Sequence, residues 1–98
     1  MAYRVLITNY AERDIEDAIL WYNKIEKSLS QRLVEELFVV FDLISSNPEI
    51  FRVRYKTLRL VNLDVFPYQI VYQIKGETIE VVAIFHSKRD PKIWKHRK

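Results

Sequence analysis

After its first ten residues, this chain of 98 residues changes the spacing of its apolar residues at Asn47-Pro48. Between residues 11 and 46, apolar residues recur every three or four positions, which is the spacing of one face of an α-helix. Beyond Pro48 they alternate with polar residues, as in a β-strand that buries one face. A proline cannot continue a helix, so the change at Pro48 is abrupt. The sequence therefore predicts an α+β protein whose helices precede most of its strands.

Two helices are predicted before this proline. They span residues from about 11 to 27 and from about 28 to 46. Asn9 with Glu12, and Ser28 with Gln31, have the spacing of capping boxes and should open the two helices. The apolar stripe of the first is Ala11, Ile15, Ala18, Ile19, Tyr22 and Ile25, and that of the second is Leu33, Leu37, Val40, Phe41 and Ile44. Because the connection is short and holds neither glycine nor proline, the helices should form an antiparallel hairpin.

The strand pattern has four segments, predicted at residues 3–8, 51–63, 66–74 and 79–85. The second is broken or bulged near Lys56-Thr57, and the chain turns at Gly76 before the last. The last strand is apolar on both faces, as expected inside a sheet. Its faces are predicted to be Ile79, Val81, Ala83 and Phe85 on one side, and Val82 and Ile84 on the other. The predicted order is β-α-α-β-β-β, a helical hairpin packed on a mainly antiparallel sheet, in one domain of residues 1–98.

The composition excludes several classes of function. The chain has a single glycine, whereas loops that bind phosphate groups need several. It has no cysteine, and its two histidines, His86 and His96, do not have the spacing of metal ligands. We therefore expect no cofactor and no metal. No apolar run approaches the roughly 18 residues that cross a bilayer, and the first residues lack the features of a signal peptide, so a cytoplasmic protein without a membrane partner is expected.

Positive charge is concentrated in the second half of the chain. Residues 1–50 contain five Lys or Arg and nine Asp or Glu, a net charge of −4, whereas residues 51–98 contain eleven and four, a net charge of +7. An anionic partner would therefore meet the second half. Charge alone leaves two interpretations open: a surface that binds a polyanion, or one that keeps the protein soluble.

The second half also carries a family resemblance. The segment FPYQIVYQIKGETIEVVAIFHSKRDPKIW, residues 66–94, resembles the C-terminal part of toxins of the RelE/ParE superfamily, from type II toxin–antitoxin modules. The shared features are a strand that begins FPY, a hairpin with one glycine, an apolar strand that ends in histidine, and a basic-Asp-Pro step before an aromatic residue. The helical hairpin and the first strand agree with it. The resemblance implies the superfamily's fold, and an antitoxin that wraps the toxin in a hetero-oligomer and holds it inactive.

The resemblance leaves the target open, because the superfamily includes inhibitors of DNA gyrase and ribosome-dependent mRNA endonucleases. An endonuclease needs a general base, a general acid and cations around the phosphate, and His86, Arg89 and Arg59 are the candidates. Two positions depart from the nuclease pattern: Gln69 stands where an arginine is usual, and Trp94, which cannot transfer a proton, where a tyrosine is frequent. These departures favour a ParE-like toxin that binds gyrase. An mRNA endonuclease is the alternative, and a non-toxic binding module of the same fold is the third interpretation.

The candidate binding residues form two groups. Those for the target are Arg52, Arg54, Lys56, Arg59, His86, Lys88, Arg89 and Trp94, and those for the antitoxin are Leu20, Trp21, Val39 and Leu43, which lie off the core stripes of the helices. Arg52, Arg54 and Lys56 recur at period two, so an anionic partner would relieve their mutual repulsion. Edge strands also carry such cations to discourage aggregation. His86 and Trp94 likewise have a structural interpretation, as a strand-end histidine bonded to backbone and as a tail residue packed on the sheet.

Overall fold

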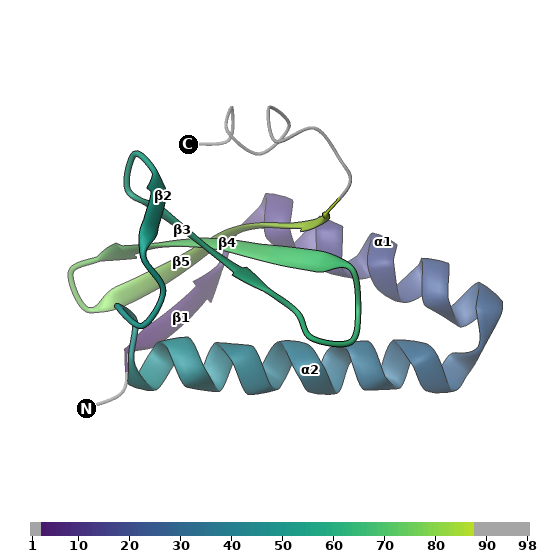
Figure 1. Ribbon diagram of the computed structural model, residues 1–98. Helices are drawn as coiled ribbons and strands as arrows, with labels where there is room; N and C mark the ends of the chain where they lie inside the picture. Colours follow the sequence, from purple (N-terminus) through teal and green to yellow (C-terminus); the bar gives the residue numbers. More distant parts are fainter. Residues whose placement is uncertain (1–2, 88–98) are drawn as a thin grey trace.

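A five-stranded sheet and a hairpin of two helices form the fold (Figure 1). The structure, a computed structural model, describes residues 3–87. The elements follow the chain in the order β1 (Arg4–Ile7), α1 (Asn9–Ile25), α2 (Lys27–Ser46), β2 (Val53–Tyr55), β3 (Leu58–Asn62), β4 (Tyr68–Lys75) and β5 (Thr78–His86). Within this range neither helix is long and apolar enough to cross a membrane.

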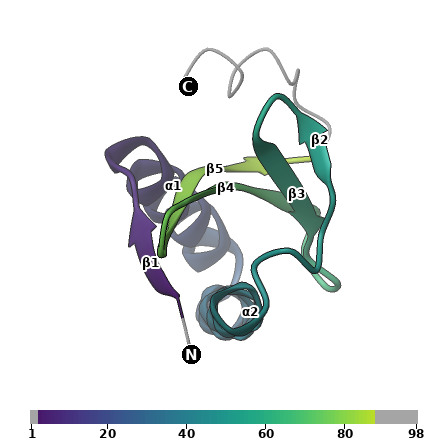
Figure 2. The same ribbon diagram turned by 90° about the vertical axis from the view of Figure 1, so that its left-hand side faces the viewer.

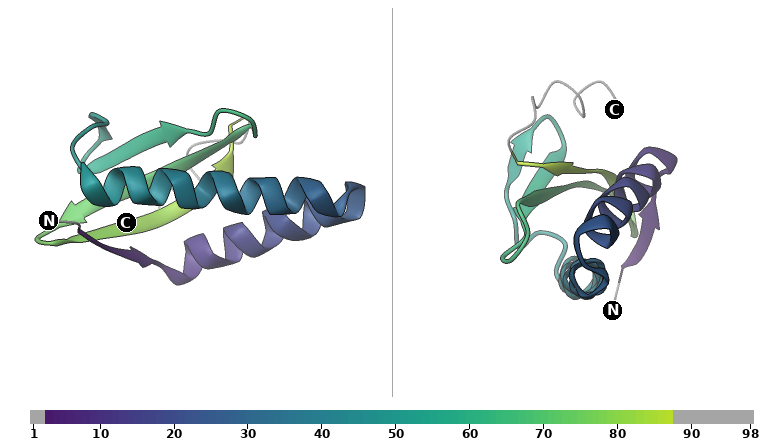
Figure 3. Two further views of the ribbon diagram at one scale, coloured as in Figure 1. Left: turned by 90° about the horizontal axis from the view of Figure 1, so that it is seen from below. Right: turned by 90° about the vertical axis from the view of Figure 1, so that its right-hand side faces the viewer.

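The sheet is mainly antiparallel. Its strand order is β1-β5-β4-β3-β2, with β1 parallel to β5 and the other neighbours antiparallel. Both helices lie against one face of the sheet, as the end-on view in Figure 2 and the views in Figure 3 show. The predicted α+β fold, a helical hairpin on a mainly antiparallel sheet, is therefore confirmed.

The main core lies between the helical hairpin and this face. The predicted stripe of α2 is buried throughout, and it packs with β4 and β5 side chains. The buried strand residues of this core include Ile70, Tyr72, Ile79, Val81 and Ile84. The stripe of α1 is confirmed in part: Ala11 and Ala18 are buried, but Ile25 is 60% exposed. Ile25 is the last residue of α1, where the chain leaves the sheet to enter α2.

Both predicted capping boxes are wrong. The N-cap of α1 is Thr8, whose hydroxyl accepts a hydrogen bond from the Ala11 amide (3.3 Å) and donates one to the Val81 carbonyl (3.0 Å). Asn9 is therefore already helical. The second helix starts at Lys27 after Glu26, whose side chain makes no capping bond. One serine joins the two helices instead, since the buried Ser30 hydroxyl contacts both Asn23 Oδ1 and the Lys27 carbonyl.

The expected bulge near Lys56-Thr57 is a chain reversal. Tyr55 pairs with Leu58 across it, and Lys56 adopts a left-handed backbone conformation with φ of 52°. The segment predicted as one broken strand is therefore a hairpin of two strands, which raises the number of strands after the helices from three to four. A left-handed residue turns the chain too sharply to continue a strand.

A β-bulge in β5 changes which side chains face the helices. The register shifts where Val71 pairs with Ala83 and Tyr72 pairs with Val81, which leaves Val82 as an extra residue. A bulge moves every later residue to the opposite face. Ile84 therefore joins the main core, whereas Ala83 and Phe85 join Val82 in a smaller cluster on the other face. The predicted division of β5 is therefore confirmed as far as Val82 and wrong beyond it, for Ala83, Ile84 and Phe85.

Tyr72 ties the loop between α2 and β2 to the sheet. Tyr72 is fully buried, and its hydroxyl donates a hydrogen bond to the Pro48 carbonyl (2.8 Å). Burial raises the pKa of this hydroxyl above its usual value of 10.0, and the nearby Arg59 guanidinium opposes the rise. A buried carbonyl that loses its donor carries a desolvation penalty.

Tyr72→Phe should therefore lower the free energy of unfolding by about 1–2 kcal/mol, because the Pro48 carbonyl loses its partner while the ring still fills the core. Urea unfolding followed by far-UV circular dichroism measures it. Tyr10→Phe is the control, since Tyr10 is 58% exposed and should change stability by less than about 0.5 kcal/mol. Equal effects of the two substitutions would show that the Tyr72 bond does not stabilise the loop.

The raised pKa of Tyr72 predicts a loss of stability in alkali. The unfolded chain releases the tyrosine proton from about pH 10, whereas folded Tyr72 keeps it to higher pH, so above pH 10 the unfolded state binds fewer protons. The free energy of unfolding then falls as the pH rises. Between about pH 8 and about pH 11 the stability advantage of the wild type over Tyr72→Phe should therefore shrink. A constant advantage over this range would mean that the pKa of Tyr72 is not raised.

Candidate functional site

The predicted target-binding residues lie in three places. Arg52, Arg54 and Lys56 are exposed in and around β2, at one edge of the sheet. Arg59 lies on β3, and His86 ends β5. Three further candidates, Lys88, Arg89 and Trp94, lie outside the described residues.

The three cations near β2 do not lie on one regular strand face. The pairing of β2 shifts between Val53 and Tyr55, and the left-handed turn at Lys56 ends the alternation. The Lys56 ammonium group instead lies 5.4 Å from the centre of the Tyr55 ring. In the described part of the chain none of the three cations forms an ion pair with a carboxylate; the ion pair there joins Lys75 and Glu80 (3.6 Å). No carboxylate within residues 3–87 is therefore in direct ion-pair contact with them.

Arg59 has a structural role. Its Nη1 donates a hydrogen bond to the Phe51 carbonyl (2.6 Å), so the guanidinium group is held against the segment that precedes β2. Arg59 pairs with Tyr72 on β4, and His86 pairs with Tyr68. At about 3.3 Å per residue, this offset of four residues is about 13 Å along β4. The two strands also flank β4 on opposite sides, a further separation of roughly 10 Å. The structure therefore does not bring Arg59 and His86 together.

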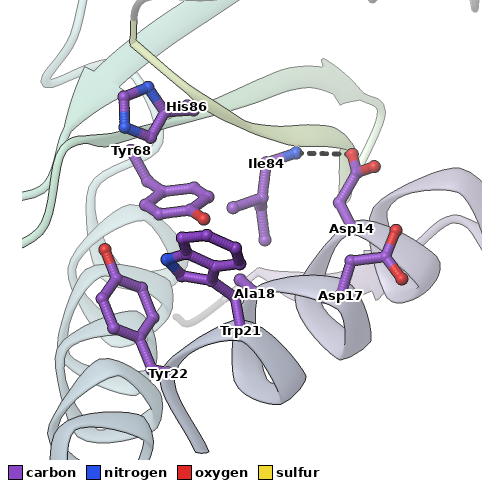
Figure 4. Close-up of a pocket in the computed structure, with 8 residues that line it drawn as sticks. All are labelled: Asp14, Asp17, Ala18, Trp21, Tyr22, Tyr68, Ile84 and His86. Carbon is purple, nitrogen blue, oxygen red and sulfur yellow. Dashed lines mark hydrogen bonds between the residues drawn. The ribbon is translucent and has the colours of Figure 1, made fainter. Parts of the chain in front are cut away.

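His86 instead lines a hollow beside α1, which we call the α1 hollow (Figure 4). It has a volume of about 530 Å³ and is lined by Asp14, Asp17, Ala18, Trp21, Tyr22, Tyr68, Ile84 and His86. The spacing of Asp14, Asp17, Ala18 and Trp21 places them on one face of α1. The bulge at Val82 turns His86 toward the same side of the sheet. The sequence analysis did not predict this hollow. The i, i+3, i+4, i+7 spacing could have shown that its four α1 residues lie on one face of the helix.

Hydrogen bonds and ring contacts hold the walls of the α1 hollow. Asp14 Oδ2 accepts a hydrogen bond from the Ile84 amide (3.0 Å), which ties α1 to β5. The Tyr68 ring packs edge-on against the rings of both His86 (5.5 Å between centres) and Tyr22 (6.2 Å). Burial raises the pKa of the Tyr22 hydroxyl, so this hydroxyl is neutral near pH 7. The hollow thus combines aromatic rings with two carboxyl groups.

A second hollow, which we call the α2 groove, lies between α2 and the β2–β3 hairpin. It has a volume of about 430 Å³ and is lined by Glu36, Val39, Val40, Leu43, Phe51, Arg54, Leu60, Val61, Asn62 and Asp64. One wall is the face of α2 that carries Val39 and Leu43, which are 67% and 40% exposed. Glu36 accepts hydrogen bonds from the amides of Asp64 and Val65, the first at 2.7 Å, and so fixes the loop after β3 to the helix. The groove offers apolar surface next to the cation of Arg54.

The four predicted antitoxin-binding residues are all exposed, but they do not line one hollow. Trp21 lines the α1 hollow, whereas Val39 and Leu43 line the α2 groove, and Leu20 lines neither. Phe38, beside Val39 on α2, is also exposed (63%), but it lines neither hollow.

The described residues hold no group of three or more metal-ligating side chains. In the same range, no lysine or arginine lines the α1 hollow around His86. A phosphate group there would meet two carboxylates without a described cation to neutralise it. The α1 hollow thus combines carboxylates with aromatic rings, and the α2 groove combines apolar side chains with Arg54, Glu36 and Asp64.

Comparisons with known proteins agree with this fold. Residues 5–91 match the family described as the ParE toxin of the type II toxin–antitoxin system parDE. Among curated proteins, none matches the chain. A chain in a solved structure described as a chromosomal ParDE toxin–antitoxin system from P. aeruginosa has the same fold, with a TM-score of 0.75 at 16% sequence identity over 87% of this chain and 96% of that chain. Since the family match spans nearly the whole sequence, the chain belongs to the ParE toxin family of type II toxin–antitoxin systems.

Proposed function

We propose that this toxin arrests growth by binding DNA gyrase, without catalysing a reaction itself, and that a cognate antitoxin neutralises it. The observation that carries the proposal is the separation of the two described candidates for catalysis. The Arg59 guanidinium is bonded to the Phe51 carbonyl, and His86 lies at the far end of β4 from it. A general acid and its assisting cation must reach one phosphate within hydrogen-bonding distance. This separation favours an inhibitor over a nuclease.

The charged groups around His86 also favour an inhibitor over an mRNA endonuclease. Asp14 and Asp17 line the hollow that His86 lines, and two carboxylates repel the phosphodiester that an endonuclease must hold. Nuclease chemistry needs positive charge where the transition state accumulates negative charge. The described cations Arg52, Arg54 and Lys56 lie near β2 instead, where they suit an acidic protein surface.

The α2 groove is the proposed docking site of the antitoxin. Val39 and Leu43 present apolar surface there, beside the charged groups Glu36, Arg54 and Asp64, so the groove fits an antitoxin segment whose apolar side chains are flanked by charged ones. Apolar contact supplies affinity that salt does not screen, whereas the cations near β2 contribute a part that salt weakens. Leu20 and Trp21, which are exposed on α1, remain candidates for a second antitoxin contact.

The target is tested by two assays on one purified preparation of the full chain. We expect inhibition of DNA supercoiling by gyrase from the organism that encodes the toxin, and intact mRNA on translating ribosomes. Gyrase from that organism is required, because a foreign enzyme can lack the binding surface.

Ribosome-dependent mRNA cuts with unaffected gyrase would contradict the proposal and support the endonuclease. A folded protein that affects neither process would instead support a binding module without toxicity.

The antitoxin site is tested by substitutions in the groove. Val39→Ser with Leu43→Ser should weaken antitoxin binding by about 10- to 100-fold, because two apolar anchors lose their buried contact. Replacing Arg52, Arg54 and Lys56 by glutamine should flatten the dependence of affinity on salt. Isothermal titration calorimetry at two salt concentrations measures both effects.

The matched control is Ile25→Ser, which removes an apolar side chain that is 60% exposed and lines neither hollow. It should leave the affinity within about threefold of the wild type. Unchanged affinity in the Val39 and Leu43 variant would place the antitoxin elsewhere.

A further inference from the structure

We propose that a basic amphipathic helix of a partner protein docks in the groove between α1 and α2, which we call the interhelical groove. This groove has a volume of about 360 Å³ and is lined by Ile19 of α1 and by Ser30, Gln31, Val34 and Glu35 of α2. It is separate from the α1 hollow and from the α2 groove, and the inference requires neither gyrase binding nor the antitoxin site. Two features carry it: an apolar stripe along the groove, and carboxylates on both sides of this stripe.

The apolar stripe runs along both helices. Ile19 and Val34 lie in the walls of the groove, and both are half-buried. Because the helices are antiparallel, Ile15, one turn before Ile19, lies toward the same end of the groove as Phe38, one turn after Val34. Phe38 is 63% exposed although it is aromatic. The left view of Figure 3 shows the two helices side by side, with no other described element in front of them, so the stripe is open to a partner.

Carboxylates border the stripe on each helix. The helical spacing puts Glu12 and Glu16 on the solvent side of the stripe on α1. It puts Glu35 and Asp42 on the solvent side of the stripe on α2. All four residues are exposed, and none of them forms an ion pair with a cation in the described part of the chain. The cation on this flank of α2 is Lys27, at the first position of the helix. The margins of the groove are therefore acidic, in contrast to the surface near β2.

These two features determine the chemistry of the partner. A nucleic acid, an anionic membrane or the same face of a second copy would be repelled by the four carboxylates. An apolar segment without charge would desolvate the carboxylates without pairing them. An amphipathic segment with Lys or Arg on both sides of its apolar face matches the stripe and its margins together. Its cations would also relieve the repulsion between Glu12 and Glu16, which lie four residues apart on one helix.

The groove favours a helix over an extended strand. Both of its walls are helices, whose backbone N–H and C=O groups are hydrogen-bonded within each helix. Neither wall therefore offers the free backbone groups that an added strand needs. The apolar anchors are spaced one helical turn apart, Ile15 with Ile19 and Val34 with Phe38, and side chains of a docked helix interdigitate with anchors at this spacing.

The test titrates designed peptides into the full chain. The probe has about 20 residues, with leucine at the first and fourth positions of each heptad, lysine at the fifth and seventh, and alanine elsewhere. In one control peptide glutamate replaces lysine. In the other, the residues of the probe are reordered so that the leucines no longer share one face of a helix.

The backbone amide signals of Ile19 and Val34 in proton–nitrogen NMR spectra report binding, because both residues line the groove. With the probe we expect a saturable shift of both signals and a Kd of about 0.1–1 mM. Each control peptide should bind at least about tenfold more weakly, since one lacks the cations and the other lacks the apolar face.

Variants of the groove locate the site. Glu16→Gln with Glu35→Gln removes one carboxylate from each side of the stripe and should weaken probe binding several-fold. Phe38→Ala shortens the stripe and should weaken probe binding about tenfold. Amide signals elsewhere in each spectrum show that the variant is folded.

Each variant has a matched control outside the helices. Glu49→Gln with Glu77→Gln removes two exposed carboxylates from loops, and Val65→Ala truncates an apolar side chain that is 60% exposed in the loop after β3. Both controls should bind the probe within about twofold of the wild type. The Val39→Ser with Leu43→Ser protein should also bind it like the wild type, because these residues line the α2 groove instead.

Four results would overturn the inference. The first is the absence of a saturable shift with the probe, and the second is equal affinity for the probe and either control peptide. The third is equal weakening by the two pairs of Glu→Gln substitutions, which would reveal general attraction to an acidic protein. The fourth is loss of probe binding in the Val39 and Leu43 variant, which would place the peptide in the α2 groove. None of these outcomes depends on the gyrase assay, so this site can fail while the proposed target holds.

Discussion

Burial of one sheet face beneath the helical hairpin is the interaction on which the rest of the structure depends. The stripe of α2 and the inward residues of β4 and β5 fill this layer, and Tyr72, at its centre, is also bonded to the Pro48 carbonyl. Each fully buried aliphatic side chain contributes about 1.5–3 kcal/mol of transfer free energy, so no surface contact competes with this layer. The two hollows lie at its margins. The α1 hollow is bounded by α1 and the ends of β4 and β5, and the α2 groove by α2 and the β2–β3 hairpin.

The bulge in β5 determines which side chains of this strand line the α1 hollow. A strand without the extra residue Val82 would direct Ile84 and His86 to the face away from the helices. With it, Ile84 completes the main core and His86 joins the rings and carboxylates beside α1. A single residue therefore separates a histidine placed among acidic and aromatic side chains from one on the opposite face.

The spacing of apolar residues correctly predicted the helices and most of the strands. The prediction failed where a single residue interrupts the alternation of a strand. The α2 stripe follows directly from the spacing of its apolar residues, and the turn before β5 follows from the glycine at position 76. The sequence indicated a break near Lys56-Thr57 but not the chain reversal there, and it gave no sign of the bulge at Val82, because both depend on how the strands pair. The site was predicted as separate exposed residues. Grouping Trp21 with Asp14 and His86 required the register of β5, which sequence spacing did not provide.

The central claim, that this toxin acts by binding, is tested most directly by His86→Ala. Loss of a general acid or base costs a factor of about 10²–10⁴ in rate, whereas loss of one contact in a protein interface usually costs about tenfold or less. The measurement is growth arrest as a function of induced toxin level, with the fold of the variant checked by its melting temperature. The account predicts that folded His86→Ala still arrests growth at a toxin level within about tenfold of the wild type. Complete loss of arrest in a folded His86→Ala protein would contradict it, because the toxicity would then depend on chemistry at the histidine.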